Sequence, residues 1–198
     1  MTSMRKIMLV ILVLAATSAL AGDEDVPYQE IISADADCRA YFWDGVDSLG
    51  DNKLTQAEKD FENAVKEDDG CFLAYLLLSQ IAHAEGKYEE STAYLESIPP
   101  EPPELGAMYE DLAAALRADD FGVVAEKAGN IVTAYPQTIT AIASLHLLGR
   151  AEYFMGHRAE AATILKAAYM YSALAPGTVP AYASKVEAEE LEKFAGVE

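Results

Sequence analysis

The feature that most constrains this chain is a pattern that returns every 33 to 37 residues. A small residue is followed four positions later by a bulky one in three places, with a weaker fourth copy: Ala57/Phe61, Ser91/Leu95, Ala161/Leu165 and Val124/Ala128. Successive first members are 34, 33 and 37 positions apart. Residues four apart share one face of a helix. A helical repeat of this length is typical of a solenoid of helix pairs, which usually serves to hold other molecules.

Turn-forming residues divide the apolar segments. Breaks inside repeats fall at residues 50–52, Gly86, residues 119–120 and Gly156, and breaks between repeats fall at residues 68–70, 99–103 and Pro136. No segment alternates apolar and polar residues convincingly enough to be a strand. The sequence therefore predicts an all-α fold, with helices over residues 37–49, 53–67, 71–84, 87–97, 104–117, 121–134, 139–154 and 157–172.

The first 21 residues have the pattern of a secretory signal peptide. Arg5 and Lys6 precede the apolar run of residues 7–16, and Ala19-Leu20-Ala21 supplies the small residues that a signal peptidase requires. The apolar stretch 7–21 has 15 residues, fewer than the roughly 20 that span a bilayer, so an uncleaved anchor is the weaker alternative. We predict cleavage after Ala21 and a periplasmic or secreted protein without membrane insertion after cleavage.

The charge of the chain limits the classes of molecule that it can bind. The whole sequence has 14 basic and 33 acidic residues, and removal of residues 1–21 would leave 12 basic residues and a net charge of −21. Nucleic acids and anionic lipid surfaces would repel such a chain, because binding them normally requires Lys and Arg to displace counterions. The apolar fraction of 52% nevertheless indicates a folded protein. We expect a protein or peptide partner and no nucleic acid.

The chain has two cysteines, Cys38 and Cys71, which lie 33 residues apart, almost one repeat. Each would stand at the start of the first helix of its repeat, and equivalent residues of stacked repeats are neighbours. An oxidising compartment favours a disulfide, although a bridge requires Cα atoms within roughly 7 Å. A disulfide and a pair of buried free thiols are therefore both open. No C-x-x-C pattern indicates redox chemistry.

These repeats resemble the tetratricopeptide repeat, which places a bulky residue and Leu-Gly in its first helix, a small residue and an aromatic in its second, and often a proline at its end. Three repeats match well: Tyr41, Gly45, Ala57, Phe61 and Ala64; Tyr75, Leu78, Ser91, Leu95 and Pro103; Leu145, Leu148, Gly149, Ala161, Leu165 and Ala168. The third repeat departs most, with Met108, Asp111 and Leu112 in the first helix and Val124 and Ala128 in inverted slots, although Pro136 agrees.

The resemblance implies a right-handed superhelix of antiparallel helix pairs, with about four repeats over residues 38–71, 72–104, 105–141 and 142–175. The segment 22–37 would be partly flexible. After residues 176–177, Thr178 can cap a last helix, so residues 176–198 are predicted to cover the open end of the stack.

In this family the first helix of each pair lines the concave face, which implies a binding groove for a peptide or helix. The block of residues on that face, at helical spacing, comprises Phe42, Val46, Leu49, Leu76, Gln80, His83, Tyr109, Ala113, Leu116, Arg117, His146, Arg150 and Tyr153. Arg117, Arg150 and the histidines among aromatics would suit apolar anchors with an acidic group. The Lys and Asn pattern of carboxylate-clamp members is absent.

Residues 47–58 also resemble a calcium-binding EF-hand loop, with Asp47, Asp51 and Glu58 at ligand spacings. Leu49 occupies a position that requires an oxygen ligand, and Asn52 replaces the usual glycine. An acidic repeat turn explains the same residues. Divalent-cation binding is therefore kept as the alternative to a scaffold function.

Catalytic motifs are missing from the sequence: we find no G-x-S-x-G, no H-E-x-x-H and no phosphate-binding glycine loop. His83, His146 and His157 are scattered rather than placed at metal-ligand spacing. We predict a scaffold or adaptor that is not an enzyme and uses no cofactor.

Overall fold

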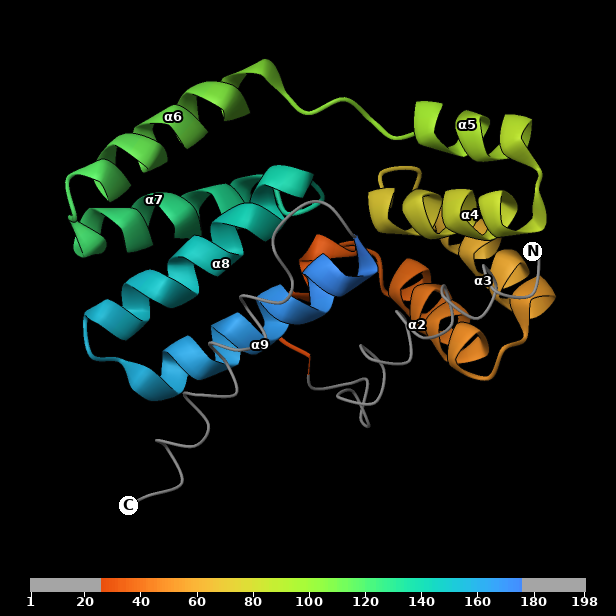
Figure 1. Ribbon diagram of the computed structural model, residues 1–198, viewed down its shortest axis with the longest axis horizontal. Coiled ribbons are helices and arrows are strands. Elements are labelled where there is room, and N and C mark those ends of the chain that lie inside the picture. Colours follow the sequence, from red (N-terminus) through yellow and green to blue (C-terminus); the bar gives the residue numbers. More distant parts are fainter. Residues whose placement is uncertain (1–25, 176–198) are drawn as a thin grey trace. The chain divides into compact units, whose positions relative to one another are not determined.

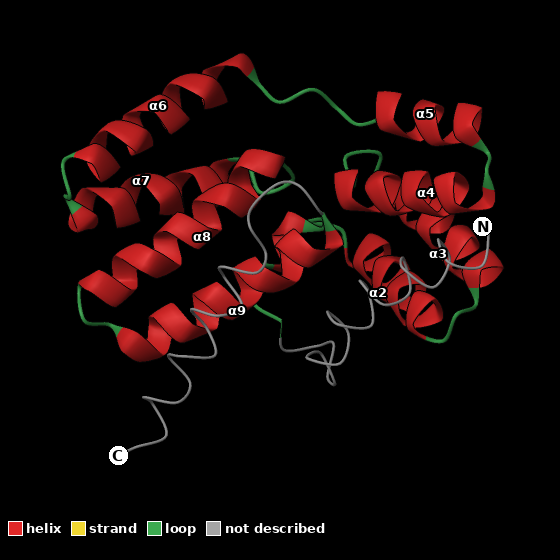
Figure 2. Ribbon diagram, viewed as in Figure 1, coloured by secondary structure: helices red, strands yellow, loops and turns green. Residues whose placement is uncertain are grey.

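The computed structural model describes residues 26–175, and the structural statements below concern this part of the chain. It contains a short 3-10 helix, η2 (Gln29–Ile31), α-helices and, within these residues, no strand (Figure 2). The α-helices are α2 (Ala36–Gly50), α3 (Leu54–Glu67), α4 (Phe72–Glu85), α5 (Tyr88–Glu96), α6 (Pro103–Arg117), α7 (Phe121–Ala134), α8 (Ile139–Phe154) and α9 (Arg158–Leu174) (Figure 1). The predicted all-α class is confirmed, and every predicted helix end lies within two residues of the observed one. The leader predicted for residues 1–21 and the capping helix predicted for 176–198 lie outside the described residues.

The helices are joined in pairs by a turn that recurs along the chain. Each turn contains one residue with a left-handed backbone: Asn52 (φ 59°), Gly86 (φ 83°), Asp119 (φ 53°) and Gly156 (φ 91°). These four residues are 34, 33 and 37 positions apart, which is the spacing of the small residues in the sequence. The pairs α2–α3, α4–α5, α6–α7 and α8–α9 are therefore four copies of one helix-turn-helix unit.

A backbone hydrogen bond closes each of these turns. The amide that follows the left-handed residue donates to the carbonyl five positions earlier: Lys53 to Ser48 (2.8 Å), Lys87 to Ala82 (2.9 Å), Asp120 to Ala115 (3.2 Å) and His157 to Glu152 (2.9 Å). This bond belongs to the Schellman motif, which satisfies a carbonyl left free at the end of a helix. Glycine adopts the left-handed backbone at little cost, and Asn and Asp tolerate it better than most residues.

The chain forms two compact units, which we describe separately. One comprises residues 26–100 of the described chain with Ala173–Ala175, and the other comprises Glu101–Ser172. The superhelix implied by the family resemblance and the repeat boundaries at 38–71, 72–104, 105–141 and 142–175 stay predictions.

In the first unit, α2 and α3 approach closely because α2 carries a glycine where they meet. A Cβ atom at Gly45 would lie 2.7 Å from the Phe61 ring. Phe61 and Ala57 are fully buried, and the Phe61 ring packs against that of Phe42 at 5.6 Å. Ala57 and Phe61 are thus both buried as the pattern predicts, and the close approach at Gly45 lets the Phe61 ring fill the core between the helices.

In the second unit, α8 and α9 meet in the same manner. A Cβ atom at Gly149 would lie 2.7 Å from Leu165, and both Leu165 and Ala161 are buried. Glu101 accepts hydrogen bonds from the amide (2.8 Å) and hydroxyl (2.7 Å) of Thr140, so the proline-rich segment is fixed to the first turn of α8. A carboxylate stabilises this end of a helix because the free amides carry partial positive charge.

One predicted core residue is exposed. Leu95, the bulky member of the second copy, has 48% of its surface exposed, in contrast to the buried Phe61 and Leu165. Helix α5 ends at Glu96 and is followed by prolines, so no further turn continues the buried stripe beyond Leu95. None of the described helices combines the length and apolar character needed to cross a bilayer.

Candidate interaction surface

The residues predicted to line a groove differ widely in exposure. Phe42, Val46 and Leu49 are between 0% and 1% exposed, so they are core residues and cannot contact a partner. Their helix is rotated so that this stripe faces inward, with the Phe42 ring between Trp43 (5.4 Å) and Phe61 (5.6 Å). His146 is also buried, at 8% exposure. Leu76, Gln80, Tyr109, Ala113 and Leu116 are half-buried, and the exposed members are His83, Arg117, Arg150 and Tyr153.

Two of the exposed residues belong to an aromatic cluster in the second unit. We call Phe121, Arg150, Tyr153 and Phe154 the Phe154 cluster. The Phe154 ring stacks on Phe121, at 4.5 Å and an interplanar angle of 22°, and meets the Tyr153 ring edge-on at 5.5 Å. Phe154 is 52% exposed and Tyr153 is 41% exposed. The cluster joins the first residue of α7 to the last turn of α8, two helices that run side by side (Figure 1).

The cluster also carries a cation. The guanidinium carbon of Arg150 lies 6.0 Å from the centre of the Phe154 ring, a distance at which a cation is attracted to the face of an aromatic ring. The next residue after Phe154, Met155, is 37% exposed. Aromatic, Met and Arg side chains are the types enriched at protein interfaces, because they combine large apolar area with directed polar contacts.

A second exposed aromatic pair lies in the first unit. The ring of His83, at the end of α4, meets that of Tyr88, at the start of α5, edge-on at 5.1 Å. Tyr88 is 54% exposed. Lys87, next to Tyr88 in the chain, forms ion pairs with the carboxylates of Glu58, Glu85 and Glu90 at 3.1, 3.0 and 3.7 Å. Hydrogen bonds to Glu85 and Glu58 raise the pKa of Lys87.

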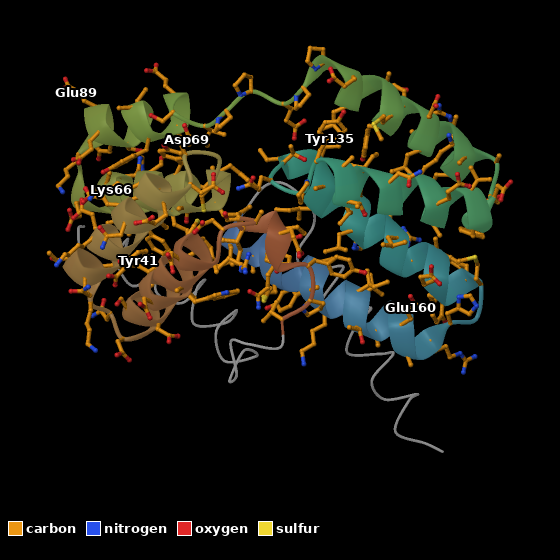
Figure 3. The ribbon with its side chains drawn as sticks, turned by 180° about the vertical axis from the view of Figure 1, so that it is seen from behind. Tyr41, Lys66, Asp69, Glu89, Tyr135 and Glu160 are labelled. Atoms are coloured by element: carbon orange, nitrogen blue, oxygen red, sulfur yellow. The ribbon has the colours of Figure 1, made fainter. Side chains whose placement is uncertain are left out.

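The turn between α8 and α9 gathers a second set of functional groups. Glu152, His157 and Glu160 each offer a ligand atom, and these atoms all lie within 4.8 Å of one another. The Nδ1 atom of His157 is 2.6 Å from the carboxylate of Glu152. Glu160, on the first turn of α9, is labelled in Figure 3. We call these residues the Glu152 triad. A histidine with two carboxylates is a set of donors that Zn²⁺ accepts.

The predicted calcium loop is not formed. Helix α2 continues through Asp47 to Gly50 and α3 begins at Leu54, so only three residues of the twelve lie outside helices. The side chain of Asp51 pairs with Lys53 at 2.6 Å, and that of Glu58 pairs with Lys87 at 3.1 Å. Among the described residues, the one group of ligand atoms close enough to share an ion is the Glu152 triad. The left-handed backbone at Asn52 serves the repeat turn instead.

The two cysteines are neighbours in the first unit. Both are fully buried and are free thiols in the structure, and each one shifts the pKa of the other. The hydrogen bond with Cys38, together with burial, holds the pKa of Cys71 well above its usual range, so this thiol stays protonated.

Sequence reasoning missed Phe121, Phe154 and the Glu152 triad. The signal for Phe154 was the pair of adjacent aromatics Tyr153 and Phe154, separated from the turn glycine by one residue, where the end of a helix leaves side chains uncovered. The signal for the triad was a glutamate five residues before His157 and another three residues after it. The left-handed turn at Gly156 brings the first pair together, and helical spacing brings the second.

Comparison with known proteins identifies the repeat. Residues 48–116 match the family model of the tetratricopeptide repeat. No curated protein and no solved structure matches the chain. Tetratricopeptide repeats generally mediate protein–protein interactions and are typically scaffolds without catalytic activity. The match begins in the last turn of α2, covers α3, α4 and α5, and ends within α6. It therefore includes the first two of the recurring turns, at Asn52 and Gly86. Residues 48–116, about a third of the chain, are therefore similar to the tetratricopeptide repeat, and this match supports membership of that family.

Proposed function

We propose that this protein is an exported interaction module that holds a partner peptide or helix at the Phe154 cluster. The observation that carries this proposal is the stack of Phe121 and Phe154 at 4.5 Å, with 52% of Phe154 left exposed. An aromatic that is held in one position but uncovered loses little conformational entropy when a partner buries it. This surface retains two residues of the predicted groove, Arg150 and Tyr153.

The partner segment should carry an apolar or aromatic anchor next to a carboxylate. The anchor would cover Phe154 and Tyr153, and the carboxylate would pair with Arg150, whose planar guanidinium can donate two parallel hydrogen bonds. The support for an acidic group is electrostatic. With 33 acidic and 14 basic residues, the chain repels acidic segments from most of its surface, so an arginine within an aromatic cluster selects where such a segment can bind.

A peptide-display library panned against the purified chain tests this proposal. Peptides selected by the wild type should share an apolar anchor and a nearby Asp or Glu. Their affinity should fall at least tenfold in Phe154→Ala and in Arg150→Glu, because each removes one element of recognition.

The matched control is Tyr88→Ala, which removes an aromatic of nearly equal exposure (54% against 52%) from the first unit. Binding should be unchanged in this variant, and all three variants should melt like the wild type. Equal affinity for wild type, Phe154→Ala and Arg150→Glu would place the binding surface elsewhere.

Export is supported by the leader pattern of residues 1–21. Expression of the full chain in a bacterium, followed by fractionation and N-terminal sequencing, should give a protein that begins at Gly22 outside the cytoplasm. Retention of residues 1–21 in the cytoplasmic fraction would contradict this part of the proposal.

The Glu152 triad favours a second candidate function, binding of a divalent transition metal. The nitrogen donor of His157 suits Zn²⁺ better than Ca²⁺, which takes oxygen ligands. Titration with Zn²⁺ against a chromogenic chelator should show one site that is lost in His157→Ala and kept in His83→Ala, since His83 is also exposed but lies in the other unit. Equal zinc binding by both variants would reject the triad as the site.

A further inference from the structure

We propose that Cys38 and Cys71 form an intramolecular disulfide while the chain folds in an oxidising environment. The bridge would join the first turn of α2 to the residue that precedes α4. It would thus link the first helices of two successive repeats and close a loop over the intervening helix α3.

Three observations place the two sulfurs together. Both side chains are 0% exposed, and each thiol interacts with the other closely enough to shift its pKa. The segments that carry them are tied independently, because the hydroxyl of Ser33 donates to the carboxylate of Asp68.

Backbone hydrogen bonds fix each cysteine within its segment. The amide of Cys38 donates to the Asp35 side chain (2.8 Å), and the amide of Cys71 donates to the Asp68 carbonyl (3.1 Å). The contact between the sulfurs is therefore held by both flanking turns rather than by one flexible side chain.

The oxidation requires a partner such as a low-molecular-weight disulfide. The thiolate of Cys38 attacks one sulfur of the oxidant and forms a mixed disulfide, and one thiol leaves. The thiolate of Cys71 then attacks the Cys38 sulfur, and the second thiol leaves. Two protein thiols become one disulfide, and the oxidant takes up the two electrons and two protons as two thiols.

Burial of the two thiols determines at which stage of folding the disulfide can form. A dissolved oxidant cannot reach thiols that are fully buried, and the protonated state of Cys71 makes it a poor nucleophile in the folded protein. The bridge should therefore form before the core closes, as a structural cross-link. Reduction and oxidation of the finished fold should both be slow.

The test is to refold the reduced full chain with oxidised glutathione, and then to denature it in an alkylating reagent. We expect no alkylation, an intact mass lower by two hydrogens than that of the reduced chain, and a crosslinked peptide containing both cysteines. The melting temperature should exceed that of the reduced protein by about 10 °C, because the bridge restricts the unfolded chain.

Serine variants provide the controls. Cys38→Ser/Cys71→Ser should melt like the reduced wild type and should not respond to reductant. Each single variant should leave one thiol that forms no intramolecular bridge. Two alkylated cysteines after oxidative refolding, or only intermolecular dimers of the wild type, would overturn the proposal.

The rate of oxidation tests whether the disulfide forms before or after folding. Oxidation during refolding should be at least tenfold faster than oxidation of the reduced protein after folding. Equal rates would reject a cross-link that forms before the core closes.

Discussion

The two helices of pair α4–α5 contact each other differently from those of pairs α2–α3 and α8–α9, although all three pairs share the same turn. In α2–α3 and α8–α9, a glycine of the first helix contacts a buried bulky residue of the second: Gly45 meets Phe61 and Gly149 meets Leu165. In α4–α5, Ser79 and Ser91 share a buried hydrogen bond of 2.9 Å. Ser79 lies 34 residues after Gly45, and Ser91 lies 34 residues after Ala57. The repeat therefore fixes where helices turn, while the contact between them can be apolar or polar.

The difference changes the surface as well as the core. Phe61 and Leu165 are buried, but Leu95, 34 residues after Phe61, is 48% exposed. Full burial of such a side chain contributes about 1.5–3 kcal/mol, whereas a hydrogen bond contributes about 1 kcal/mol net. The contact between α4 and α5 should thus contribute less to the free energy of unfolding than the contacts in the other two pairs. The following predictions test this, from the largest expected effect to the smallest.

Arginine at the small position should unfold the apolar pairs. Ala57→Arg and Ala161→Arg each force a long charged side chain into a fully buried contact, so we expect a loss of more than about 4 kcal/mol. Thermal melting followed by circular dichroism measures the loss. The matched control is Ala159→Arg, at an exposed position of the same helix α9. Wild-type melting of Ala161→Arg would show that the repeat register is wrong.

Valine at the two contact glycines should be the next most damaging change. Gly45→Val and Gly149→Val place side chains where a Cβ atom already lies 2.7 Å from a neighbour, and overpacking of this kind costs about 1–3 kcal/mol. Gly45→Val should be the worse of the two, because a phenylalanine ring yields less than a leucine side chain.

The control for the glycines is Gly129→Ala in α7, where an added Cβ atom meets nothing within 4 Å. Alanine favours a helix over glycine, so this variant should gain up to about 1 kcal/mol. Urea unfolding of the three variants gives the comparison. Equal effects at Gly45 and Gly129 would show that the close approach of α2 and α3 is unimportant.

The serine pair offers a double-mutant cycle. Ser79→Ala or Ser91→Ala leaves one buried hydroxyl without its partner, at a cost of about 1–2 kcal/mol each. The double variant should cost less than the sum of the singles, because no hydroxyl is then left unpaired. Denaturant unfolding of all four proteins gives the coupling. Additive costs would mean that the two hydroxyls do not stabilise the pair through their shared bond.

Leu95 should matter least. Leu95→Ser should change the free energy of unfolding by within about 0.5 kcal/mol, since the side chain is half exposed. Truncation of the bulky residue at the matching buried position, Leu165→Ala, should cost about 2–5 kcal/mol. The same urea experiment measures both. A loss above 1 kcal/mol for Leu95→Ser would show that this residue is covered in solution.

Much of the helical pattern was readable from the sequence, while most of the candidate site was not. The turn residues Gly86 and Gly156 were recognisable because glycine is the residue that adopts a left-handed backbone at least cost. The face that each helix buries was harder, because one residue of error rotates the stripe by about 100°. That error placed Phe42 on the surface, where the structure buries it against Phe61.

The sequence by itself determined where the described helices turn, to within two residues, because each turn depends on residues at most five positions apart. The bond from His157 to the Glu152 carbonyl is one example. The tertiary structure alone decided that Phe121 stacks on Phe154 and that Ser33 reaches Asp68. These contacts join residues about one repeat apart, and they depend on how neighbouring helices pack, which a local pattern does not specify.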